Sequence, residues 1–129
     1  MDKLNRLIGT LALFIASAGI AQGAELFTPP LAPTSLAGDN FGECVSTNIS
    51  DTTRDVLVQG FNSEGVVVIN TAFTVEPNKT RGVSLTEAAP TGPVIFCKFS
   101  FKGSASNIRA AIHVLDGGGD GIISALEAR

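Results

Sequence analysis

Residues 94–102 read VIFCKFSFK, and this stretch decides the fold because its residues alternate in a two-residue period. That period places successive side chains on opposite faces of an extended chain, so the segment is predicted to be a β-strand. One face would turn toward a core and the other toward solvent. The inward set is Ile95, Cys97, Phe99 and Phe101, and the outward set is Phe96, Lys98, Ser100 and Lys102.

Six further segments carry strand signals, with turn residues between them at a spacing of about ten residues. The sequences NSEG at 62–65 and EPNK at 76–79 supply typical turn chemistry. Evenly spaced short strands predict an all-β fold, an antiparallel immunoglobulin-like β-sandwich of about seven strands. The predicted strands cover residues 42–49, 54–61, 66–75, 80–86, 94–102, 107–115 and 122–128.

Alternation in the third of these segments assigns its faces. Val67, Ile69, Phe73 and Val75 are predicted to share one face. Polar Asn70 and Thr74 fall on the other face, together with Ala72.

The chain has two cysteines, Cys44 and Cys97. In an oxidising compartment an isolated pair is expected to form one disulfide, and the absence of a C-x-x-C spacing argues against a redox pair. Closing a loop of this length would stabilise the fold by about 4 kcal/mol in the chain-entropy model. The pattern around Cys44 leaves open which way its side chain faces.

The beginning of the chain has the three parts of a secretory signal peptide. A basic start precedes the apolar sequence LIGTLALFIASA at 7–18, and small residues follow. Cleavage is expected after Ala21, Gly23 or Ala24, which would leave roughly 105 residues, a normal size for one domain. The compact signal and the low cysteine count favour a bacterial host.

We therefore divide the chain into a signal peptide at 1–23, a Pro-rich extended lead at 24–40 and a β-sandwich domain at 41–129. A membrane-spanning helix needs about 20 apolar residues. The signal reaches that length only by counting Gly19, Gln22 and Gly23. No stable membrane span is expected after cleavage, and the protein is expected to be exported to the periplasm or the extracellular space.

The amino-acid composition argues against two classes of function, nucleic-acid binding and sugar binding. The formal net charge of the chain is −3, with no basic cluster, whereas nucleic-acid binding needs dense Lys and Arg against phosphate. The chain also has no Trp and no Tyr, the rings on which sugars commonly stack. We expect no nucleic-acid partner.

Residues 116–127, DGGGDGIISALE, partly match a calcium-binding EF-hand loop. Asp116, Asp120 and Glu127 occupy ligand positions, but Gly118 stands where another oxygen ligand is required. The alternative, which we favour, is a glycine-rich turn between two strands. The preceding residues also permit a helix. These three acids remain weak metal candidates, calcium is the one cofactor they could bind, and no metal site is assigned.

His113 is the single histidine of the chain. A catalytic triad would need it beside a Ser or Cys nucleophile and an orienting carboxylate. No G-x-S-x-G motif is present, so no catalytic residue is assigned. A small secreted hydrolase around His113 is kept as an alternative function.

Residues 43–129 resemble small exported bacterial β-sandwich proteins that carry one cysteine pair. The features behind this resemblance are CVSTNISDTTR, FNSEG, EPNKT, FCKF and the closing IRAAIHVLD and LEAR. It implies a sandwich and brings no activity with it. The function we expect is non-enzymatic surface interaction with a protein of the cell envelope or of an extracellular assembly, with a calcium-dependent binding module as the alternative.

Overall fold

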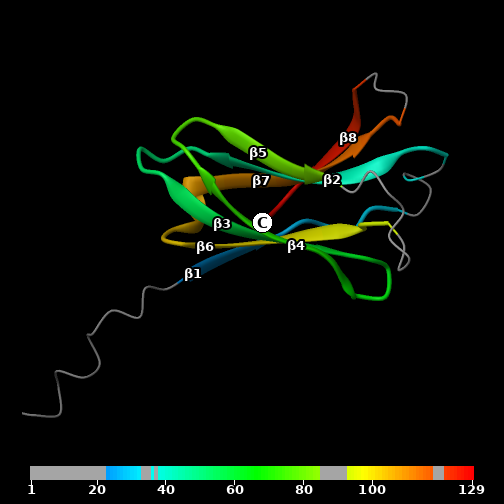
Figure 1. The fold of residues 1–129 in the computed structure, drawn as a ribbon, viewed down its shortest axis with the longest axis horizontal. Helices are drawn as coiled ribbons and strands as arrows, with labels where there is room; N and C mark the ends of the chain where they lie inside the picture. Colours follow the sequence, from blue (N-terminus) through cyan, green and yellow to red (C-terminus); the bar gives the residue numbers. More distant parts are fainter. Residues whose placement is uncertain (1–22, 33–35, 37, 85–92, 118–120) are drawn as a thin grey trace, which may run out of the picture.

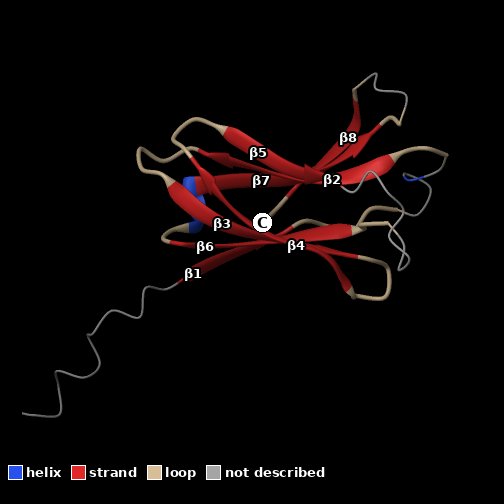
Figure 2. Cartoon of the chain, in the orientation of Figure 1, coloured by secondary structure: helices blue, strands red, loops and turns tan. Residues whose placement is uncertain are grey.

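A computed structural model of the chain describes residues 23–32, 36, 38–84, 93–117 and 121–129. Two antiparallel sheets of four strands face each other across the core, as Figures 1 and 2 show. The predicted all-β architecture of two antiparallel layers is confirmed. The predicted signal peptide lies outside the described residues, apart from Gly23.

Each sheet takes its strands from distant parts of the chain. Sheet A has the order β1-β6-β3-β4, and sheet B has the order β5-β2-β7-β8. All strand pairs are antiparallel. The strands are β1 (Gly23–Phe27), β2 (Phe41–Asn48), β3 (Arg54–Phe61), β4 (Val67–Val75), β5 (Thr80–Ser84), β6 (Phe96–Lys102), β7 (Ile108–Leu115) and β8 (Ile122–Glu127), and a short 3-10 turn, η2, spans Ala105–Asn107.

The strand order is more mixed than in an immunoglobulin domain. An immunoglobulin constant domain has sheets ABED and CFG, in which three pairs of consecutive strands are neighbours. Here only the pairs β3–β4 and β7–β8 are consecutive neighbours within a sheet of the described chain. The turn sequences predicted the strands themselves, but they could not show which strands cross from one sheet to the other.

The predicted Pro-rich lead begins as a strand of the sandwich. β1 pairs with β6 along its whole length, because the prolines start only at Pro29 and leave the β1 donors intact. Beyond β1 the backbone continues beside β6. The Thr28 N–H donates to the Cys97 carbonyl at 3.0 Å, and the Leu31 N–H donates to the Ile95 carbonyl at 2.8 Å. Leu31 is buried, so this part of the lead contributes to the core.

The last two residues join the two sheets. After β8, Ala128 donates from its N–H to the Ala110 carbonyl of sheet B at 2.8 Å. Arg129 then exchanges two main-chain hydrogen bonds with Phe27 of sheet A, at 3.0 and 3.1 Å. The sandwich is thus closed along this side, and part of the β1 edge is paired.

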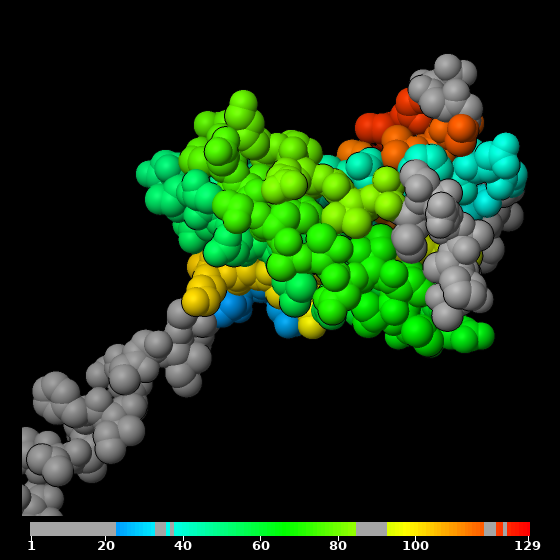
Figure 3. All heavy atoms as spheres, viewed as in Figure 1, coloured from blue at the N-terminus to red at the C-terminus, as the bar shows by residue number. Residues whose placement is uncertain are grey.

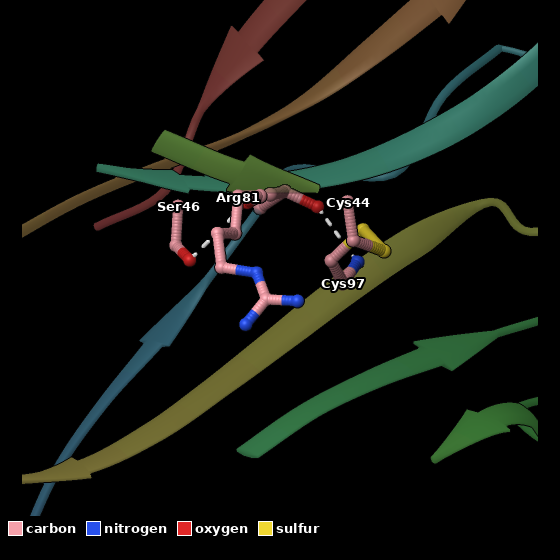
Figure 4. The surroundings of a disulfide bond; sticks show 5 residues. Cys44, Ser46, Arg81 and Cys97 are labelled. Carbon is pink, nitrogen blue, oxygen red and sulfur yellow. Dashed lines mark hydrogen bonds between the residues drawn. A yellow bond between two sulfur atoms is a disulfide. The ribbon is translucent and has the colours of Figure 1, made fainter. Parts of the chain in front are cut away.

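A disulfide joins the sheets through the core. Cys44 of β2 and Cys97 of β6 are both fully buried and are bonded at 2.06 Å, which confirms the predicted pair (Figure 4). The side chain of Cys44, whose direction the sequence left open, points into the core. Aliphatic and Phe side chains surround the bridge; the largest fully buried ones are Phe99, Ile112, Val56, Val58, Val75, Val94 and Val114.

The alternation predicted for β4 holds only from Ile69 onward. The pairing of β3 with β4 shifts by one residue between Gly60 and Phe61, which marks a β-bulge. Val67 is consequently 42% exposed, while Val68 packs against the core. The prediction that Val67 shares the core-facing side with Ile69 is wrong, because the extra residue at the bulge reverses the phase.

The described residues contain no helix that is both long and apolar enough to cross a bilayer.

Candidate functional site

Apolar side chains gather on the outer face of sheet A at one end. Phe96 of β6 lies directly opposite Phe61 of β3, and their rings stack at 4.7 Å with an interplanar angle of 4°. On the other side of Phe61 lies Val67 of β4. These three residues and Phe27 of β1, which is 45% exposed, are called here the apolar row.

Local structure explains why the apolar row reaches solvent. Phe96 and Phe61 alternate with the core residues Cys97 and Gly60, so their rings must point outward. Val67 joins them because the bulge at Gly60/Phe61 reverses its phase. Phe27 and Val67 are exposed, whereas the stacked rings of Phe61 and Phe96 are half-buried. Aromatic and aliphatic side chains side by side on one sheet face are typical of interaction surfaces.

A charged pair borders the apolar row on β1 and β6. Lys98 pairs with Phe27 across the two strands, and its ammonium lies 5.6 Å from the Phe27 ring centroid. The same ammonium is 3.1 Å from the Glu25 carboxylate. The pair is partly exposed, so it contributes little to stability. It places one positive and one negative charge beside an apolar surface, as at the rim of a protein interface.

The opposite end of the same face is hollowed. A depression of about 760 Å³ lies over small residues, among them Gly23, Ala72 and Ser100. Its walls carry two acids and two bases, and Leu57 is 37% exposed beside it. The charged residues are Glu25, Arg54, Asp55 and Lys102. Sheet A therefore offers an apolar end and a mixed-charge, hollow end.

The edge of sheet A formed by β4 is unusual among the four edge strands that the structure describes. β4 has nine residues, VVINTAFTV, none of them charged. The other three edges are shorter, and each carries a charge, at Glu25, Arg81 or Glu127. Proteins commonly protect edge strands by charges, prolines or shortness. β4 uses none of these over most of its length.

Arg81 covers one end of this edge. It extends from β5 across the gap between the sheets, close to the disulfide (Figure 4). Its Nη1 donates to the Thr74 carbonyl of β4 at 3.2 Å, and its guanidinium lies 5.0 Å from the Phe73 ring centroid. Figure 3 views the molecule from this side, where the green atoms of β3, β4 and β5 lie in front.

The EF-hand-like segment forms a β-hairpin, so the favoured turn between two strands is confirmed. Asp116 directly follows β7 and donates from its N–H to the Gly121 carbonyl at 3.2 Å. Glu127 pairs with Ala111 near the other end of the hairpin. About five residues of extended strand, roughly 16 Å, separate the backbone positions of the two acids, so the hairpin does not bring them together around one ion. Asp120 lies outside the described residues.

His113 lies half-buried on the outer face of sheet B. Its cross-strand neighbours are Glu43 on β2 and Ala125 on β8. Glu43 in turn pairs with Ser84 of β5, so the acid stands between the serine and the histidine. A triad needs the histidine in the middle, and Ser84 lies two strands, about 9.5 Å, away. The described neighbours of His113 thus supply no nucleophile.

No three His, Cys, Asp or Glu side chains of the described residues converge in a way that could hold a metal ion. A second hollow, of about 500 Å³, lies near the C-terminal crossover and includes both His113 and Glu127. Apolar and alanine residues supply much of its remaining lining. Its polar lining consists of His113, Glu127, Arg109 and the hydroxyls of Thr47 and Thr80, which are hydrogen-bonded to each other at 2.7 Å.

Comparison with known proteins gives a fold likeness. No protein-family model and no curated protein matches the sequence. The crystal structure of Thermotoga maritima 1070 is similar, with a TM-score of 0.50 over 81% of this chain and 91% of that one. The sequences are 11% identical, so the likeness concerns the fold alone.

Sequence reasoning missed the apolar row as a unit. The alternation in residues 94–102 placed Phe96 on the outward face with Lys98, which was an early sign of an exposed ring. The partners of Phe96 depend on sheet topology. Phe61 and Phe27 come from strands that are distant in sequence, and Val67 depends on the bulge.

Proposed function

We propose that this protein is an exported, non-enzymatic β-sandwich that acts by binding another protein of the cell envelope or of an extracellular assembly. The observation that carries the proposal is the apolar row. Phe27 and Val67 are exposed, and Phe61 and Phe96 between them are half-buried. Apolar side chains grouped in this way on one sheet face support an interaction site, because those on a monomer surface are usually scattered. The Lys98–Glu25 pair beside the row supplies the polar rim.

Two further features support export and a binding role. The buried Cys44–Cys97 bridge is the kind of disulfide that persists in an oxidising compartment, as expected after a signal peptide. The separation of Asp116 from Glu127, and the neighbours of His113, give the alternative calcium and hydrolase functions no support from geometry. Binding through the surface of sheet A is the function that remains best supported.

Site-specific cross-linking in intact cells tests the proposal. Phe27→Ser removes a ring that is 45% exposed, so the fold should survive, and the partner band should fall at least fivefold. Ile122→Ser is the matched control, since Ile122 is 58% exposed but lies on sheet B. Equal partner bands for both variants, or no cross-linked partner at native abundance, would contradict the proposal.

A further inference from the structure

We infer that β4 is a self-pairing edge, at which two copies of this chain join antiparallel about a two-fold axis to make one continuous eight-stranded sheet. This inference uses the β4 edge and does not depend on the apolar row. It goes beyond binding of an envelope partner, because the occupant is a second copy of the same chain.

The hydrogen bonds of β4 show which of its main-chain N–H and C=O groups point away from β3. The Thr74 carbonyl accepts from Arg81 of β5, so it points away from β3. In an antiparallel strand every second residue directs both its N–H and its C=O to the same side. Asn70 and Ala72 therefore also direct their main-chain groups to the edge. No described strand pairs with them there.

The sequence of β4 is compatible with itself in the antiparallel direction. With Thr71 on the two-fold axis, Asn70 of each copy faces Ala72 of the other, and the two residues exchange hydrogen bonds. In the same register Ile69 opposes Phe73. β4 contains no charge, so this arrangement opposes no like charges within the strand. A cyclic two-fold contact of this kind closes on itself and does not propagate.

The exposure of two core-facing residues of β4 also supports pairing with a second copy. Thr71 and Phe73 belong to the core-facing side of β4, yet Thr71 is exposed and Phe73 is only half-buried. A second β4 would extend the core across both residues. At each end of the paired strands, Glu64 of one copy would approach Glu76 and Lys79 of the other, so Lys79 supplies an opposite charge beside the two acids.

The contact is expected to be weak. One strand pair buries less than the roughly 1,200–2,000 Å² of a stable interface, so dimers should form only at high protein concentration. Arg81 limits the paired length, because it already occupies the Thr74 carbonyl. The pairing should therefore involve mainly the stretch from Ile69 to Phe73.

Cysteine cross-linking of the disulfide-bonded protein tests the register. Cys44 and Cys97 are bonded to each other, so Thr71→Cys adds the one reactive thiol of the described residues. Residues that face each other outside the hydrogen-bonded pairs have Cα atoms about 4.5 Å apart, which a disulfide can span. We expect Thr71→Cys to form covalent dimers at least tenfold faster than Ala125→Cys, an exposed position on edge strand β8.

Sedimentation equilibrium supplies a second readout. Ala72→Pro removes an edge-directed N–H while leaving the bonds to β3, and it should raise the dimer dissociation constant at least tenfold. If that variant does not fold, Asn70→Lys, which adds a charge at the exposed edge, should have the same effect. A wild-type protein that remains monomeric at the highest concentration at which it is soluble, together with equal cross-linking of Thr71→Cys and Ala125→Cys, would overturn the inference. The Phe27→Ser result would be unaffected, so the two proposals fail separately.

Discussion

Arg81 and Thr74 tie the two sheets together on the side opposite the C-terminal crossover. Nη1 of Arg81 donates to the Thr74 carbonyl at 3.2 Å, while the guanidinium stacks near the Phe73 ring at 5.0 Å. One side chain of sheet B therefore satisfies an edge acceptor of sheet A and shields an aromatic ring from water. A charge beside an otherwise uncharged edge strand is a known device against unwanted strand addition.

Removing this side chain should expose the edge. We predict that Arg81→Ala lowers the free energy of unfolding by about 1 kcal/mol, through the lost hydrogen bond and cation–π contact. It should also increase self-association, because the Thr74 carbonyl becomes free. Urea denaturation and sedimentation velocity measure the two effects. Arg109→Ala, on the exposed outer side of β7, is the control and should change neither quantity.

The disulfide should carry a large share of the stability. Cys44 and Cys97 are 53 residues apart, and the chain-entropy model assigns a loop of this size about 4 kcal/mol. The double variant Cys44→Ala/Cys97→Ala should therefore unfold at a much lower guanidinium concentration than the oxidised protein. Reduced wild-type protein should behave like the double variant. A midpoint close to that of the oxidised protein would show that the bridge adds little.

Asn48 should be the most sensitive buried polar residue. Its Nδ2 donates to the carbonyls of Thr52 and Val75, both at 2.8 Å, and its Oδ1 accepts from the N–H and hydroxyl of Ser50. Asn48→Ala removes four hydrogen bonds of a fully buried side chain, so we expect a loss of about 2–3 kcal/mol in urea denaturation.

The exposed Asn70 provides the comparison for Asn48. Asn70→Ala, measured at low protein concentration, should lie within about 0.5 kcal/mol of wild type, since surface substitutions usually do. Similar losses in both variants would mean that the hydrogen bonds of Asn48 add nothing specific.

Short-range patterns predicted the strands well because strand and turn signals are local. The alternation of residues 94–102 gave the phase of Cys97 correctly, and the turn sequence NSEG marked the β3–β4 hairpin. The sequence could not predict which strands belong to the same sheet. β6 lies between β1 and β3, and no local property of FCKFSFK names those neighbours. Strand β1 was not predicted, although it begins at the last residue of the predicted signal peptide and continues into the predicted lead. The nearby prolines favoured an extended lead over a paired strand.

The surface features were harder to predict than the core. The sequence predicted the wrong face for Val67, because the β-bulge shifts the pairing of β3 with β4 but leaves no signal in the sequence. The apolar row needs three strands and that bulge, so it exists only in the folded sheet. The EF-hand-like spacing of Asp116 and Glu127 illustrates the converse, because residues at suitable sequence positions were separated by an extended strand.

The position of β1 leads to a prediction for the cleavage site of the proposed signal peptide. Gly23 pairs with Lys102, and Ala24 packs against the core. Cleavage after Ala24 would delete both residues from a five-residue strand, whereas cleavage after Ala21 would leave the strand whole. If the chain is exported as proposed, we therefore expect mass spectrometry of the mature protein to show Gln22 as the first residue. In a direct comparison, a chain starting at Gln22 should have a higher thermal midpoint than one starting at Glu25, and equal midpoints would remove the physical basis for this choice.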